Sequence, residues 1–217
     1  MATTVHEPPR TEEEVRSGGG GFHDLVPADG NLRALRDHSP EPSRTGIWVG
    51  LAAITMSFAA LTSALIVRQG AAPDWRHFTL PRILYLNTLV LLISSVSLEV
   101  SRRRFAPTSL REIKFSARWL YATLFLGMAF VAGQYLAWRQ LASEGLFLAT
   151  NPSSSFFYVF TVLHALHVLG GLAGLMYVIR RLKRFALRPS TLDVTSYYWH
   201  FMDVLWLYLL LVLLIRL

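Results

Sequence analysis

Five long stretches of the chain are almost entirely apolar, and shorter polar segments separate them. Residues 46–67 contain no charged side chain, and neither do residues 119–138. At a rise of about 1.5 Å per residue, 22 helical residues reach about 33 Å, which suffices for a hydrocarbon core of about 30 Å. The pattern predicts membrane-spanning helices at about 46–67, 80–101, 118–139, 156–179 and 194–216, and therefore an all-α integral membrane bundle over residues 46–217.

Residues 1–45 have a different character. They are rich in proline and glutamate, contain four consecutive glycines at 18–21, and carry eight acidic residues against five arginines. Such a segment has too few apolar residues to form a packed core. We expect a disordered, acidic, glycine- and proline-rich arm.

Composition agrees with a membrane protein and excludes several kinds of site. The chain is 53% hydrophobic and only 16% charged, whereas about a quarter of the residues of a soluble domain are charged. It contains no cysteine. Disulfides, thiolate-bound zinc, iron–sulfur clusters and covalently attached c-type haem are therefore excluded.

The distribution of basic residues predicts the orientation. Segments 102–118 and 180–195 hold six and five Lys or Arg residues, and the arm adds five more, whereas the opposite side carries five in total. By the positive-inside rule the N-terminus and both basic segments are cytoplasmic and the C-terminus is periplasmic. The excess positive charge then faces anionic lipid, which argues against nucleic acid as a partner.

Several polar residues fall inside the predicted spans, where a charged group costs about 2.5–3.5 kcal/mol even on insertion scales. Each of them therefore needs a partner or a function. They are Asn87, Glu99, Gln134, His164, His167, His200 and Asp203.

His164 and His167 are three residues apart and share a helix face. They are either ligands of haem or copper, or histidines that hydrogen-bond to neighbouring helices. A haem–copper centre with its low-spin haem needs six histidines, and four of the seven in this chain lie outside the spans. A single bis-histidine haem b would need His200, which lies at a different depth. We therefore expect no metal or cofactor in this chain.

His200 and Asp203 are also three residues apart, and a hydrogen bond between them is one way to offset the cost of their burial, with Glu99 at a comparable depth. The three form either a proton relay or a structural clamp between the second and fifth helices. Arg180 and Arg181, just beyond the fourth helix, are either solvated determinants of topology or bidentate ligands of a lipid phosphate.

Three motifs resemble subunit III of the haem–copper oxidases, the cytochrome c oxidase family. Tyr198–Trp206 reads YWHFMDVLW, similar to the family signature YWHFxDVxW, and Phe160–Gly171 (FTVLHALHVLGG) matches HxLHVxxG. Leu86–Glu99 (LNTLVLLISSVSLE) is similar to LNTxxLLxSS. The resemblance covers residues 46–217 and fits the short, five-helix bacterial form. One residue departs from the pattern, because Ile54 stands where the family usually has a glutamate.

The resemblance implies a non-catalytic accessory subunit of a proton-pumping terminal oxidase in the bacterial inner membrane. Haem and copper are then expected in partner subunits I and II, and subunit I is the main contact. The resemblance also implies support of proton uptake, stabilisation of subunit I and binding of phospholipid through Arg180 or Arg181. It assigns a structural or proton-related role to Asn87, Glu99, Gln134, His164, His167, His200, Asp203 and Trp206.

Other functions remain open at this point. The chain is equally compatible with subunit III of a quinol oxidase or with an accessory protein of a nitric oxide reductase, because these differ in parts that this chain does not contact. A small b-type membrane cytochrome and a channel or transporter are alternatives of another class.

Overall fold

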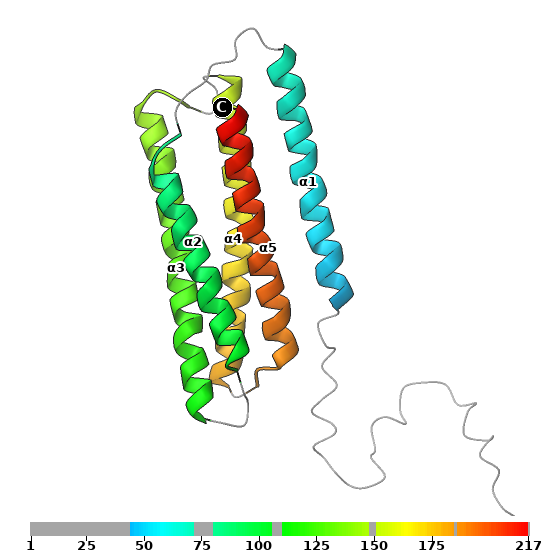
Figure 1. Cartoon of the computed structure of the whole chain (residues 1–217), viewed down its shortest axis with the longest axis vertical. Helices are drawn as coiled ribbons and strands as arrows, with labels where there is room; N and C mark the ends of the chain where they lie inside the picture. The colour runs from blue at the N-terminus through cyan, green and yellow to red at the C-terminus, as the bar shows by residue number, and fades with distance from the viewer. Residues whose placement is uncertain (1–43, 72–79, 106–109, 148–150, 185, 217) are drawn as a thin grey trace, which may run out of the picture. The chain divides into compact units, whose positions relative to one another are not determined.

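The computed structural model describes residues 44–71, 80–105, 110–147, 151–184 and 186–216. These residues form five helices (Figure 1): α1 (Arg44–Ala71), α2 (Ile83–Arg103), α3 (Leu110–Ser143), α4 (Pro152–Lys183) and α5 (Pro189–Arg216). Each helix is long and apolar enough to cross a membrane. The predicted class, an all-α bundle with five membrane-spanning helices, is confirmed, whereas the orientation of the termini stays a prediction. The predicted arm lies outside the described residues, apart from Arg44 and Thr45 at the start of α1.

Most of the helices are longer than the sequence predicted. The largest difference is in α3, which begins at Leu110 instead of about residue 118. The prediction ended each helix where charge begins, but Arg, Lys and Glu are good helix formers and extend a helix into the interface. At α2 the start was predicted too early: Pro81 lies in a turn before Ile83, with its carbonyl accepting from the Leu84 N–H.

Consecutive helices run in opposite directions (Figure 1). We call the end at which α2 and α4 finish and α3 and α5 begin the basic end. It carries basic residues in the last turns of both α2 and α4: Arg102, Arg103, Arg180, Arg181 and Lys183.

Small and hydroxylated side chains bring α2 and α3 together. Ser101 and Ser116 are joined by their hydroxyls at 2.7 Å, and Ser97 donates to the carbonyl of Trp119 at 3.0 Å. A Cβ atom on Gly133 would lie only 2.0 Å from Oδ1 of Asn87. Gly133 therefore leaves the space that the Asn87 side chain occupies, and a larger residue there would displace that side chain.

Two tryptophans of α5 fill the interior. Trp199 is buried and donates to the hydroxyl of Ser94 at 3.0 Å. Its indole lies against Gly127 and Gly171, where an added Cβ would approach it to 2.7 Å and 3.1 Å. Trp206, also buried, donates to the hydroxyl of Thr88 at 2.9 Å. Both indole N–H groups are thus satisfied by α2, as buried tryptophans require.

Helix α1 packs beside α5 and is mostly exposed (Figure 1). Phe58 is buried and stacks on Phe160 of α4 with ring centroids 6.4 Å apart. On α5, Tyr208 donates to the hydroxyl of Thr62 at 2.9 Å. In its apolar stretch only 17% of the residues of α1 are buried, against 33–44% in the other four helices.

Candidate functional site between α2 and α5

A network of charged side chains joins α2 to α5 at the basic end. Nε and Nη2 of Arg102 both donate to the Glu99 carboxylate at 2.8 Å, and Nη1 donates to Asp193 of α5 at 3.2 Å. Nε of Arg103 also donates to Glu99, at 2.6 Å. A guanidinium that engages both oxygens of a carboxylate is a strong and orienting contact. Glu99 is thereby held in place and its charge is balanced.

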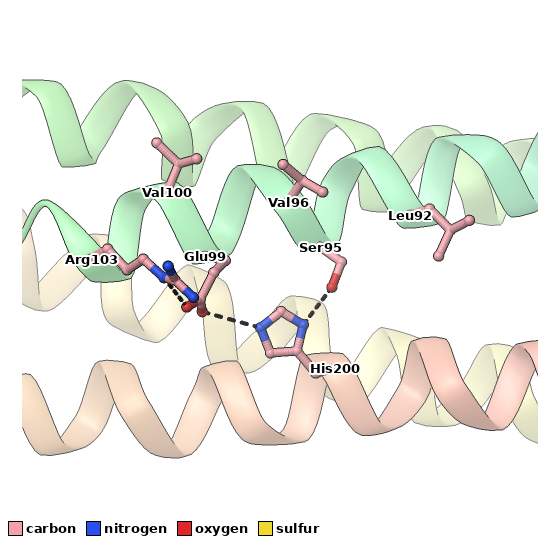
Figure 2. A pocket seen from close by; sticks show the side chains of 7 residues that line it. All are labelled: Leu92, Ser95, Val96, Glu99, Val100, Arg103 and His200. Atoms are coloured by element: carbon pink, nitrogen blue, oxygen red, sulfur yellow. Dashed lines mark hydrogen bonds and ion pairs between the residues drawn. The ribbon is translucent and has the colours of Figure 1, made fainter.

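His200 extends this network one step deeper into the bundle. Its Nδ1 lies 2.5 Å from the hydroxyl of Ser95, and its Nε2 lies 3.5 Å from Oε2 of Glu99 (Figure 2). Ser95 and Glu99 stand one turn apart on α2, so that a single imidazole of α5 meets both. This is the link between the second and fifth helices that the clamp interpretation expected.

A groove of about 430 Å³ runs along this network. Seven residues line it (Figure 2): Leu92, Ser95, Val96, Glu99, Val100, Arg103 and His200. Arg103 and Glu99 lie towards the basic end together with Val100, and Val96 and Leu92 continue the groove towards the middle of the span. Leu92 and Val96 are 40% and 64% exposed, so the groove opens to the outer surface of the described bundle.

The hydrogen bond suggested between His200 and Asp203 is not formed. His200 is turned towards Ser95 and Glu99, whereas Asp203 is only 5% exposed and neither of its carboxyl oxygens has a hydrogen-bond partner among the described residues. Residues three apart share a face only broadly, and here one faces the groove while the other faces the core.

His164 and His167 do not form the predicted pair of interhelical hydrogen bonds. His164 is fully buried, and neither ring nitrogen has a partner among the described residues. Its ring packs between Trp206 and Phe130, with centroids 5.1 Å and 5.9 Å away. His167 uses Nδ1 within its own helix, 2.7 Å from the carbonyl oxygen of Leu163.

The remaining predicted polar residues lie within or beside the core. Asn87 donates to the carbonyl of Phe130 at 3.4 Å, whereas Gln134 is 1% exposed and its amide has no partner among the described residues. Trp206 also meets Phe130 edge to face, with ring centroids 5.0 Å apart. Ile54 is half-buried and packs against the hydrophobic core.

Arg180 and Arg181 are both exposed at the end of α4. The guanidinium of Arg181 lies 5.2 Å from the ring centroid of Tyr177, and its Nε donates to the Tyr177 hydroxyl at 2.9 Å. Arg181 therefore has a partner within its own helix already.

Sequence reasoning missed the serine partners and the basic partners of the site. Ser94 and Ser95 are buried, and they supply the groups that meet Trp199 and His200. A run of serines inside an otherwise aliphatic span was the signal that could have identified them, since hydroxyl groups in spans often hydrogen-bond between helices. Arg102 was counted only as a loop charge, although its spacing from Glu99 favours an ion pair on one helix face.

Cofactor-binding groups are sparse in this arrangement. No group of three or more His, Cys, Asp or Glu side chains converges on one point within the five described segments. The geometry defines a class of protein: a multi-pass helical membrane protein with polar links between α2 and α5.

Comparison with known proteins identifies the family. A family model described as cytochrome c oxidase subunit III matches residues 55–216. A protein of Nocardia farcinica named "Probable cytochrome c oxidase subunit 3" is 31% identical over 84% of this chain and 93% of its own length. One of the same name from Mycobacterium leprae is 35% identical over 82% and 91%. "Quinol oxidase subunit 3" of Bacillus spizizenii is 29% identical over 83% and 91%. The chain belongs to the cytochrome c oxidase subunit III family of the haem–copper oxidases.

Proposed function

We propose that this chain is the non-catalytic subunit III of a proton-pumping haem–copper terminal oxidase that uses cytochrome c. Family membership is the observation that carries the proposal, because it makes the chain part of a multisubunit oxidoreductase. In this proposal haem and copper belong to partner subunits I and II, and this chain holds neither.

The surroundings of the histidines support a non-catalytic role. The ring of His164 is enclosed by Trp206 and Phe130, and one nitrogen of His167 faces a carbonyl of its own helix. His200 is engaged by Ser95 and Glu99. These three are the histidines of the spans, and their packing and bonding support structural roles in place of haem ligation.

The stabilising role concerns subunit I, the main partner in this proposal. In such a role the chain offers its partner a rigid surface, and three interhelical contacts of α5 support that rigidity. They are the indole bonds of Trp199 and Trp206 to α2 and the Tyr208 bond to α1. We therefore expect a complex without this chain to start at a normal rate of oxygen consumption and to lose activity sooner during turnover.

Support of proton uptake and phospholipid binding complete the proposal. In this proposal the basic end faces the bacterial cytoplasm, because most of the Lys and Arg residues next to the membrane-spanning helices lie there. There Glu99 and His200 are ionisable groups that can exchange protons, and the neighbouring arginines attract anionic lipid.

A quinol oxidase is the second candidate. It is favoured by the relative named "Quinol oxidase subunit 3", which covers as much of the chain as the cytochrome c oxidase relatives do. An accessory role in a nitric oxide reductase has no comparable relative among those reported above.

Affinity purification of the tagged chain from its native membranes tests the proposal. We expect a large haem-containing subunit and a copper-binding subunit in the purified complex, together with oxygen consumption on reduced cytochrome c. Oxygen consumption on quinol alone would select the second candidate. Isolation of the chain by itself with its own haem absorption band would contradict both and favour a b-type cytochrome.

A further inference from the structure

We propose that the groove between α2 and α5 binds one glycerophospholipid, with its phosphate against Arg103 and one acyl chain along Val96 and Leu92. The inference rests on the proposed phospholipid-binding role and gives it a location that differs from Arg180 and Arg181. Four features of the groove carry it: a free guanidinium edge, the depth of its polar groups, a hydrogen-bond donor at that depth, and an aliphatic wall.

Arg103 supplies the anion-binding group. Its Nε is bound to Glu99, but its two Nη atoms have no partner among the described residues, and its side chain is 76% exposed. Arg102, in contrast, uses Nε, Nη1 and Nη2 on Glu99 and Asp193. Because Arg102 balances the charge of Glu99, Arg103 can still attract a second anion, and a phosphate matches the geometry of its free edge.

The depth of the polar groups fits the interfacial layer of a bilayer. Glu99 stands four residues from Arg103, or about 6 Å along the helix. A bilayer is about 40–45 Å thick with a hydrocarbon core of about 30 Å, which leaves an interfacial layer of about 5–8 Å on each side. With a phosphate at Arg103, the glycerol ester groups therefore reach the level of Glu99 and His200.

His200 provides a donor for an ester carbonyl at that level. In the tautomer in which Ser95 donates to Nδ1, the proton of the ring is on Nε2. Nε2 lies 3.5 Å from Oε2 of Glu99, which is a long contact for an N–H donor. An ester carbonyl oxygen in the groove would share this N–H with Glu99, whose contact with His200 is the dashed line in Figure 2.

The rest of the groove is suited to a hydrocarbon chain. Val96 and Leu92 are aliphatic, exposed and one helical turn apart on α2, and Leu92 lies deeper than Ser95. An acyl chain laid along them continues in the direction set by the phosphate and the ester. Unlike an annular lipid, a lipid held in this way has polar contacts at two depths and an apolar contact below them.

Photo-crosslinking of the intact oxidase complex tests the site. The probe is a phosphatidylglycerol with a photoreactive diazirine in its acyl chain, added to phosphatidylcholine vesicles that contain the complex. We expect crosslinks concentrated on residues 92–100 of α2. Arg103→Gln removes the phosphate contact, and Val96→Trp fills the groove without changing charge. Each is expected to lower labelling there about tenfold, the effect of losing a charge-assisted contact or the space for the chain.

Two matched variants control for charge and bulk elsewhere. Arg111→Gln removes an exposed base from the basic end of α3, and Met128→Trp adds an indole to an exposed position of the same helix. Neither is expected to change labelling of residues 92–100.

The outcomes separate this inference from the proposed function. Equal labelling of all exposed helices would mean annular lipid only and would overturn the site, as would a partner subunit found covering the groove. Labelling unaffected by Arg103→Gln and Val96→Trp would overturn it as well. If the chain does not co-purify with an oxidase at all, the proposed function fails, and that result is read before any crosslinking.

Discussion

Two histidines of this protein show two ways of placing a polar ring inside a membrane bundle. His200 lies at the edge near the basic end, where Ser95 and Glu99 meet its nitrogens. His164 lies in the centre, where Trp206 and Phe130 meet the faces and edges of its ring and no described residue meets its nitrogens. The first is a hydrogen-bonded link between helices, and the second is an aromatic side chain that fills space.

The difference shows which forces hold each region together. At the basic end, long charged side chains satisfy one another, so the contribution of this region depends on charge and on salt. In the central layer, which His164, Trp206 and Phe130 form, dispersion contacts between closely packed rings dominate, and these contacts are insensitive to salt. Two histidines of one chain therefore have different roles, and we expect the stability of the two regions to depend on different substitutions.

The largest expected effect comes from the central layer. Trp206→Ala removes a fully buried indole, its bond to Thr88 and the ring contacts of His164 and Phe130. Truncation of a buried Trp costs about 3–5 kcal/mol. We expect a clear fall in the thermal unfolding temperature of the purified complex, or loss of the chain from it. Trp48→Ala, at a position 62% exposed, is the control. Equal falls in the unfolding temperature for the two variants would show that the central layer contributes no more to stability than an exposed tryptophan does.

The second largest loss of stability is expected at the basic end. Glu99→Gln keeps the shape of the side chain but removes the charge that Arg102 and Arg103 share. Hydrogen bonds to charged groups are worth about 1.5–3 kcal/mol. Thermal unfolding in low and high salt should show a loss that shrinks at high salt. Glu144→Gln, an exposed position, is the control and should change stability by less than about 0.5 kcal/mol. A loss independent of salt would contradict the electrostatic origin.

Replacement of each histidine by phenylalanine compares the two regions directly. His200→Phe removes an interhelical hydrogen bond, worth about 0.6 kcal/mol on average and up to about 1.7 kcal/mol in membrane bundles. His164→Phe keeps an aromatic ring and removes two nitrogens that have no described partner, so stability should stay the same or rise. The unfolding temperatures of the purified complexes that carry each variant measure this difference. A larger loss for His164→Phe would reveal a bonding partner of His164 in the complex.

Much of the fold could be predicted from the sequence because membrane spans are specified by composition over long stretches. Five apolar runs predicted five helices in the observed order. The ends were less accurate, as in α3, because charge marks the limit of the hydrocarbon core and not the limit of the helix. α4 likewise begins at Pro152, ahead of its predicted start at about residue 156.

The site could be predicted only in part, because the direction of a side chain depends on helix rotation. Sequence spacing grouped His200 with Asp203, but the rotation of α5 turns them towards different neighbours. The polar residues themselves were found because charge in a span is rare. Their partners Ser95 and Arg102 were not, since a serine or a flanking arginine is common in membrane helices.

The smallest expected effect tests which residue His200 is coupled to. A double-mutant cycle of Glu99→Gln and His200→Phe should give a coupling energy of about 0.5 kcal/mol, typical of a partly exposed pair. A second cycle with Asp203→Asn and His200→Phe should give a smaller value, because no hydrogen bond joins these two side chains. Both cycles use the unfolding temperature of the purified complex at one salt concentration. The opposite order would mean that α5 is rotated in the assembled oxidase, and that the spacing of His200 and Asp203 had indicated the correct pair.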